Sequence, residues 1–359
     1  MPIRELRYLL AYLVPLSMAA GLAWRGPWSW LTPAFVFGLV PVLEEVLLPR
    51  PRPEPQVPAV THSSARLNRF FDALLYLNVP LLYGLLGWYL ITVARVPLTT
   101  HELVGLTLAQ GICCGAMGIN VAHELGHRPG RLPQVLAQLL LLASLYLHFF
   151  IEHNRGHHRH VATPHDPATA RRGEALYAFI LRSMGGGWWS AWQLEAARLR
   201  KLGHVQWHPW HNQMLRFQLL QVLALLTVGA LLGIKAALAY LAVGILGGTL
   251  LEIINYVEHY GLLRREVRPG VYERVQPHHS WNAEQPLGRV LLYELTRHSD
   301  HHYLASRPFQ QLRYQPSGPQ MPAGYPAMML LATLPPLWFR VMHARLTQAQ
   351  QAAAQLASD

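Results

Sequence analysis

Apolar residues along this chain fall into long runs that are separated by shorter polar, arginine-rich segments. A helix needs about 20 apolar residues to cross about 30 Å of hydrocarbon, and six runs approach or reach that length. We predict membrane-spanning helices over residues 6–24, 28–48, 70–94, 102–122, 216–233 and 236–257. The first run could instead be a cleaved signal peptide, but it is long for one and further apolar runs follow it. The pattern therefore favours an all-α integral membrane protein.

Two more apolar stretches do not fit a simple count of spans. Residues 133–151 are long enough to cross, but one crossing would put His127 and His153 on opposite sides of the membrane. If these two histidines share a site, the segment must be re-entrant or buried within the protein near the cytoplasmic face, and we predict this. The stretch 323–341 contains three prolines, which favour a docked or interfacial helix over a seventh span.

Composition agrees with a membrane protein and limits the other classes. Hydrophobic residues make up 52% of the chain and charged residues 14%, against about 25% charged residues in an average soluble protein. The net charge of +11 comes mostly from arginines between the apolar runs, including Arg52 of a proline-rich connector over residues 51–58. This is the positive-inside pattern, and no basic cluster interleaved with aromatic residues indicates nucleic-acid binding. We predict one domain over residues 1–346 and a flexible tail over 347–359.

The chain has two cysteines, Cys113 and Cys114, which are adjacent within an apolar run. Neighbouring cysteines rarely form an unstrained disulfide, and an iron–sulfur cluster needs several thiolates. Any electrons used in a reaction must therefore come from another protein.

Histidines gather in four short groups at the ends of the apolar runs or just beyond them. We call these groups boxes one to four. They comprise His123 and His127; His153, His157 and His158; His259; and His298, His301 and His302.

The spacing within the first and last boxes suits a metal. His123 and His127 are four residues apart, so on a helix they lie on one face. His298, His301 and His302 have the spacing i, i+3, i+4, which also gives one face.

The second box is less regular. On an ideal helix His153, His157 and His158 would spread over about 140°, but Gly156 can relax the backbone so that all three converge. Ionisable side chains near a bilayer are costly and usually functional. We therefore interpret the nine histidines as metal ligands.

The identity of the metal stays open on these grounds alone. His123 and His127 with Glu124 also match the His-Glu-x-x-His signature of zinc proteases, in which Glu124 would be the general base. One catalytic zinc needs about three protein ligands, which would leave most of the histidines unused. Nine imidazoles suit two ions, and nitrogen ligands accommodate iron, zinc or copper. Metal storage or transport is a further alternative, disfavoured because the boxes come from distant segments.

The four boxes resemble those of the bacterial membrane-bound alkane 1-monooxygenase family, as do residues 161–171 and 276–282, and the similarity extends from about residue 30 to 345. The resemblance implies a multi-pass protein of the bacterial inner membrane, related to the integral-membrane desaturases. It implies six spans, with a cytoplasmic, histidine-rich cap that holds two non-haem iron ions. Arg128, Thr296 and Tyr303 depart from the usual family residues. The implied iron ligands are His123, His127, His153, His157, His158, His259, His298, His301 and His302.

Polar residues beside these ligands are candidates to hydrogen-bond the imidazoles from outside, as carboxylates commonly do at metal sites. They are Glu124, Glu152, Glu258, Asp300, Asn255, His278 and His279, the last two being alternatively a substrate gate. For a substrate channel between the first four helices we propose Val36, Phe37, Leu39 and Val40 as lining.

The resemblance implies hydroxylation of the terminal methyl group of medium-chain or longer alkanes. The reaction would use O₂ and electrons from a rubredoxin-like donor with an NAD(P)H-dependent reductase. Hydroxylation of alkyl-aromatic methyl groups, as by xylene monooxygenase, and lipid desaturation are the alternatives, with an intramembrane zinc protease more distant. A basic surface for an acidic donor is expected at Arg155, Arg159, Arg171, Arg172, Arg264 and Arg265.

Overall fold

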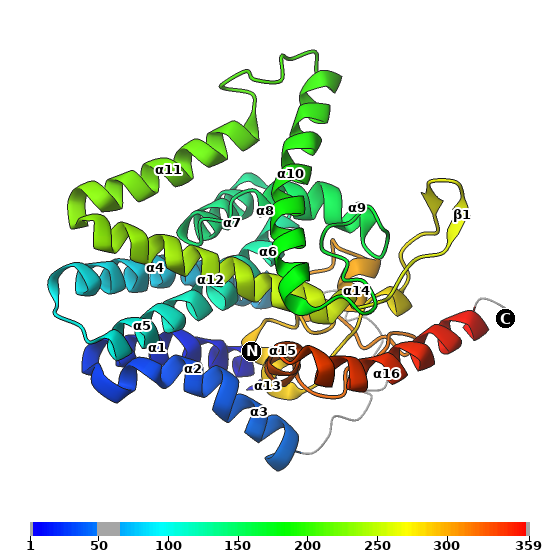
Figure 1. Ribbon diagram of the computed structural model, residues 1–359, viewed down its shortest axis with the longest axis horizontal. Coiled ribbons are helices and arrows are strands. Elements are labelled where there is room, and N and C mark those ends of the chain that lie inside the picture. Colours follow the sequence, from blue (N-terminus) through cyan, green and yellow to red (C-terminus); the bar gives the residue numbers. More distant parts are fainter. Residues whose placement is uncertain (1–2, 49–64, 357–359) are drawn as a thin grey trace. The chain divides into compact units, whose positions relative to one another are not determined.

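Helices make up most of the protein, as the apolar pattern predicts (Figure 1). The computed structural model describes residues 3–48 and 65–356, so the proline-rich connector over residues 51–58 lies outside the described residues. The α-helices are α1 (Leu13–Trp24), α2 (Leu31–Ala34), α3 (Val40–Val42), α4 (Ala65–Arg95), α5 (Thr100–Cys113), α6 (Asn120–Gly126), α7 (Arg131–Ala143), α8 (Phe149–Glu152), α9 (His158–His160), α10 (Leu176–Lys201), α11 (Gln213–Leu232), α12 (Ile234–His259), α13 (Pro286–Leu291), α14 (His298–Tyr303), α15 (Tyr325–Ala332) and α16 (Pro335–Leu356).

Segments with other helical geometry continue or join these helices. The 3₁₀ segments are η1 (Ile3–Tyr12), η2 (Gly26–Trp30), η7 (Pro277–His279) and η8 (Phe309–Gln311). The π-helical segments are η3 (Phe35–Leu39), η4 (Leu43–Leu47), η5 (Cys114–Ile119) and η6 (His153–His157). Strands β1 (Glu266–Arg268) and β2 (Val271–Tyr272) form an antiparallel hairpin in which Glu266 pairs with Tyr272.

Six helical segments of the described chain are long and apolar enough to cross a membrane. They are Glu5–Trp24, Gly26–Leu47, Leu67–Arg95, Thr100–Gly126, Gln213–Leu232 and Ile234–His259. Their bounds follow the predicted runs closely, and the largest difference is that the fourth continues through Gly126 instead of ending at residue 122. The prediction of an all-α membrane fold with six spans is confirmed.

The chain divides into two compact units that alternate along the sequence. Unit 1 comprises residues 1–38, 64–156 and 187–251, and unit 2 comprises residues 39–63, 157–186 and 252–359. Unit 1 therefore contains His123, His127 and His153, whereas unit 2 contains the other six histidines of the boxes. The single domain over residues 1–346 stays a prediction.

Residues 133–151 do not form one span. The 13-residue helix α7 is too short to cross, and the chain reverses after it at residues 144–148, where Leu145 has a φ of 50°. The side chain of Ser144 donates a hydrogen bond to the carbonyl of Cys114 at 3.2 Å, and Tyr240 donates to the carbonyl of Leu142 at 2.7 Å. The segment thus folds back within unit 1, as a re-entrant or buried segment would.

Three glycines of the fourth span allow neighbouring segments of unit 1 to approach closely. A Cβ atom on Gly111 would lie 2.7 Å from Cβ of Leu246, and one on Gly115 would lie 3.5 Å from Cβ of Leu250. The α5–η5 segment therefore packs directly on α12, which is the close helix packing that small residues permit.

A comparison of alanine variants at Gly118 and Gly115 tests this packing. Replacing Gly118 by alanine is expected to lower the stability of the detergent-solubilised protein by about 1–3 kcal/mol, because the added methyl would meet Oγ of Ser144 and lie 3.2 Å from Leu82. The matched variant Gly115→Ala makes only ordinary contacts and should be nearly neutral. Thermal unfolding of both variants measures the difference; equal midpoints would contradict the packing argument.

Unit 2 has its own aromatic core around the end of α12. Tyr256, Tyr260, Trp281, Tyr325 and Trp338 are buried together there, with the Tyr256 hydroxyl donating to the carbonyl of Glu174 at 2.6 Å. Helices α15 and α16 pack against each other (Figure 1) and contribute to this core. Neither helix is among the candidate spans, which agrees with a docked helix over residues 323–341. Helix α16 continues to Leu356, so most of the segment expected to be a flexible tail is helical.

Candidate metal centre

Four buried imidazoles converge in unit 2, from three separate segments. His157 ends η6, His259 ends α12, and His298 and His302 lie one turn apart on α14. One ligand nitrogen of each lies within 4.8 Å of the others. Their exposed fractions are 4% or less, so water is largely excluded from the space they face.

The spacing of these nitrogens suits a single metal ion. The Nε2 atoms of His298 and His302 are 2.9 Å apart, those of His298 and His259 are 3.1 Å apart, and those of His157 and His302 are 3.2 Å apart. Two nitrogens about 2.1 Å from one ion, at angles of about 90–100°, lie roughly 3.0–3.2 Å from each other. The donor set therefore fits a transition metal in both type and spacing.

Asp166 fixes the orientation of one of these imidazoles. Its Oδ2 atom lies 3.0 Å from Nδ1 of His157 and accepts a hydrogen bond from Thr169 at 2.6 Å, while Oδ1 accepts one from the N–H of Ala168 at 3.1 Å. An ionised carboxylate can only accept, so Nδ1 of His157 carries the proton and the lone pair of Nε2 faces the cluster.

Sequence reasoning did not assign this role to Asp166. The residue lies in an irregular loop nine positions after His157, where no helical period relates the two. The available signal was its place in the segment that resembles the alkane 1-monooxygenase boxes.

Burial also favours the neutral, metal-binding form of the imidazoles. Removal from water, with a smaller effect from the neighbouring imidazoles, holds the pKa of His302 well below its usual value. Its ring is therefore neutral at pH 7 and offers a lone pair to a cation.

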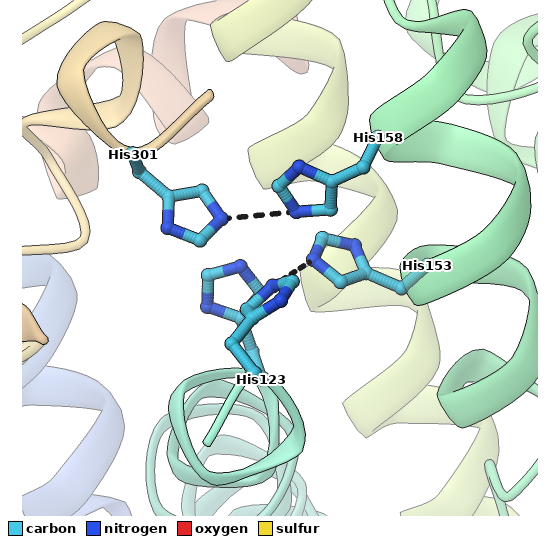
Figure 2. Close-up of side chains that lie close together, drawn as sticks. His123, His153, His158 and His301 are labelled. Carbon is cyan, nitrogen blue, oxygen red and sulfur yellow. Dashed lines mark hydrogen bonds between the residues drawn. The ribbon is translucent and has the colours of Figure 1, made fainter. Parts of the chain in front are cut away.

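A second group of imidazoles lies in unit 1. His123 is on α6, His127 directly follows that helix, and His153 begins η6. Nε2 of His127 lies 3.0 Å from Nε2 of His153, and the rings of His123 and His153 have centroids 4.5 Å apart. Figure 2 shows the side chains of His123 and His153. The i, i+4 spacing of His123 and His127 thus brings both rings to one face, as predicted.

The last two histidines form a facing pair in unit 2. Nε2 of His158 lies 3.1 Å from Nε2 of His301, and Figure 2 shows the two rings turned toward each other. The pair has the nitrogen separation of two ligands on one ion, as in the four-histidine cluster.

The three imidazoles of the second box have different partners. Nε2 of His153 pairs with His127, whereas His157 and His158 pair with separate histidines of unit 2. The expectation that all three converge is therefore wrong. The segment η6, which begins at His153 and ends at His157, is π-helical. Gly156 fits this turn because a Cβ atom there would collide with the Glu152 carboxylate.

Glu258 lies beside the four-histidine cluster. Its Oε2 atom is 3.2 Å from Nε2 of His298, and its Oε1 atom accepts a hydrogen bond from the Tyr325 hydroxyl at 2.8 Å. Glu258 is one of the carboxylates predicted to contact a ligating imidazole, and in unit 2 it makes such a contact with His298.

The two predicted carboxylates of unit 1 have other described partners as well. Glu124 forms an ion pair with Arg128 at 3.1 Å, and Arg128 also pairs with Asp72. Glu152 accepts a hydrogen bond from Ser190 at 3.3 Å. Their predicted contacts with ligating imidazoles stay predictions.

Asp300 holds a loop instead of an imidazole. Its buried carboxylate pairs with Arg307, accepts the N–H of Arg313 at 2.8 Å and contacts the side chain of Gln315. On α14 a residue two positions after His298 lies about 200° around the helix from it, so Asp300 faces away from the histidines. Asn255, also predicted, donates to Glu252 at 3.2 Å.

His278 and His279 line a separate pocket of about 820 Å³ in unit 2, together with Glu273. These three residues could hold a cation by their spacing, but Nδ1 of His279 accepts the N–H of Gln276 at 2.9 Å. The ring proton is then on Nε2, which lies 3.4 Å from the Glu273 carboxylate, and burial lowers the pKa of His279 to about 4. We therefore assign His279 to fastening the loop next to the β1–β2 hairpin.

The proposed channel residues lie at the middle of the second span. Val36 and Phe37 are partly buried, Leu39 is 50% exposed and Val40 is fully buried. Their role as channel lining stays a prediction.

Comparison with known proteins shows which families share these features. Residues 99–332 match the model of the fatty acid desaturase family. The chain is 40% identical to alkane 1-monooxygenase 2 of Pseudomonas aeruginosa, over 93% of this chain and 89% of that protein. It is 39% identical to alkane 1-monooxygenase 1 of Alcanivorax borkumensis, over 87% and 76% respectively. It is also 33% identical to the xylene/toluene monooxygenase hydroxylase component of Pseudomonas putida, over 94% and 87%.

Proposed function

We propose, because the chain belongs to the fatty acid desaturase family and groups with the alkane 1-monooxygenases, that it hydroxylates the terminal methyl group of alkanes to give primary alcohols. The observation that carries the proposal is the buried four-histidine cluster of unit 2, with Asp166 orienting His157. Such a donor set serves redox metal chemistry on a substrate that has no polar group to activate.

The metal is proposed to be a pair of non-haem iron ions. His157, His259, His298 and His302 would hold one ion. The other five histidines of the boxes are proposed to serve the second ion. When bound, the iron pair supplies the activation of O₂ and the oxidising power that an unactivated C–H bond requires.

The protein itself positions the donor atoms and keeps water out of the site. Burial keeps the imidazole of His302 neutral and excludes water, which would otherwise compete for the metal and the oxidant. Asp166 holds the tautomer of His157, and Tyr325 holds one oxygen of Glu258. These contacts hold the donor atoms ready, so that little rearrangement is needed to bind metal.

Electrons are proposed to come from a rubredoxin-like donor that is itself reduced by an NAD(P)H-dependent reductase. Arg159, Arg171, Arg172 and Arg265 are exposed in unit 2 and offer an acidic donor a complementary surface. Arg264 is held by the carbonyls of Val161 and Arg159, and Arg155 pairs with Glu195, so these two contribute less. The basic polar segments support a bacterial inner-membrane location with the site on the cytoplasmic side.

A second candidate is hydroxylation of alkyl-aromatic methyl groups. The similarity to the xylene/toluene monooxygenase component favours it, although that similarity is weaker than the similarity to the alkane enzymes. The zinc protease alternative is disfavoured, because the carboxylate of Glu124, which would act as general base, is paired with Arg128.

Product analysis tests the proposal. The purified protein, loaded with iron and supplied with a rubredoxin, its reductase and NADH, is expected to convert octane or hexadecane to the primary alcohol. Product should disappear when the rubredoxin is omitted. Oxidation of xylene alone would favour the second candidate, and no alcohol from any of the three substrates, from protein carrying about two irons per chain, would refute both.

A further inference from the structure

The carboxylate of Glu258 contacts one imidazole of the four-histidine cluster. Its Oε2 atom is 3.2 Å from Nε2 of His298, and this same nitrogen lies 3.1 Å from His259 and 2.9 Å from His302. Nε2 is therefore the atom that His298 directs into the cluster. Asp166, by contrast, contacts its imidazole at the outer nitrogen, Nδ1 of His157. The two carboxylates thus contact different ring nitrogens of their histidines.

A charge on Glu258 has no permanent counter-charge among the residues that the structure describes. Its side chain is 1% exposed, and within the described ranges no arginine or lysine contacts it. Tyr325 and His298 are its side-chain partners. Two other buried carboxylates have permanent counter-charges, because Asp300 pairs with Arg307 and Glu195 with Arg198. A buried carboxylate is costly unless it is paired or coordinates a metal.

We propose that Glu258 is a direct ligand of the metal held by His157, His259, His298 and His302. The site would then offer four nitrogens and one carboxylate oxygen, and Tyr325 would be a positioning residue that holds the second oxygen. This inference rests on the proposed function and sharpens it. The negative charge of one carboxylate would stabilise the more oxidised metal at this position, so this ion would have a charged ligand in addition to its histidines.

The decisive variant is Glu258→Gln, which keeps the shape of the side chain but removes the charge. In protein loaded with ⁵⁷Fe, Mössbauer spectra of the wild type are expected to show two iron environments. The variant should shift or lose the signal of one of them and keep the other. Its affinity for that iron should fall at least about 10-fold, as metal sites lose affinity even when an outer hydrogen-bond partner is removed.

A pair of tyrosine variants separates coordination from general disturbance of the core. Tyr325→Phe removes the hydroxyl that holds Glu258 and should shift the same iron signal by a smaller amount. Tyr256→Phe, also a buried tyrosine of this core, loses its bond to the carbonyl of Glu174 instead. It should leave both signals unchanged.

An unchanged spectrum and full iron content in Glu258→Gln would overturn the proposal and reduce Glu258 to a hydrogen-bond partner of His298. If that variant does not fold, unchanged signals in Tyr325→Phe overturn it equally. Failure of the proposed function is a different result, because the wild-type protein itself would then lack two irons or alcohol product.

Discussion

Replacing His302 by alanine is expected to abolish measurable alkane hydroxylation and to release about half of the bound iron. His302 is central to the four-histidine cluster, with Nε2 contacts of 3.2 Å to His157 and 2.9 Å to His298. Removing it leaves three imidazoles and a buried space that water can enter. Because the loss of an outer partner alone typically costs 10–100-fold, the loss of this ligand should lower iron affinity by more than about 100-fold. Iron content per chain and alcohol yield measure the two effects.

His343 provides a matched control for this substitution. It is a histidine of the same unit, hydrogen-bonded to the Tyr260 hydroxyl at 2.9 Å and outside the histidine boxes. His343→Ala should retain full iron and activity and lose only about 1 kcal/mol of stability. Equal iron loss in both variants would mean that the effect reflects the stability of unit 2 and not coordination.

Replacing Asp166 by alanine is expected to lower iron affinity and hydroxylation by about 10–100-fold. Without the carboxylate, Nδ1 of His157 loses its acceptor, and the ring is free to rotate or to carry its proton on the nitrogen that should face the metal. Asp166 is buried and also accepts from Thr169 and Ala168, so the fold is disturbed as well. Iron titration followed by product analysis gives the two magnitudes.

Asparagine at the same position separates these contributions. Asp166→Asn keeps an oxygen that can accept from His157, so it should recover part of the iron affinity lost in the alanine variant. If the asparagine and alanine variants are equally impaired, the charge of Asp166 matters more than the orientation of the ring. If neither loses iron, Asp166 does not support the metal.

The spans were predictable because hydrophobic run length is a direct physical requirement of the bilayer. The segment 133–151 was the difficult case, because hydropathy alone predicts that it crosses the membrane. Its reversal follows from requiring that His127 and His153 serve one site, and the structure confirms that α7 is too short to span. The turn at Leu145, with its positive φ, has no comparable signal in the sequence.

The candidate site was only partly predictable from spacing. Helical period correctly grouped His298 with His302, and His123 with His127. It also grouped His301 with His298 and His302, whereas His301 faces His158 instead. By the same period Asp300 faces away from the histidines, because it lies two residues after His298. The prediction that Asp300 contacts an imidazole did not take this into account. The contact of Asp166 with His157 involves a loop, and the imidazoles of the second box have partners that are distant in the sequence. No repeating pattern predicts either of these features.

Because η6 is a π-helical turn, the number of residues in the second box matters as much as their identity. Such a turn holds one residue more than an α-helical turn, so deleting a residue between His153 and His157 would tighten the winding of this segment and change how the two imidazoles are oriented relative to each other. Engineers who alter this enzyme must therefore preserve the number of residues between these two histidines.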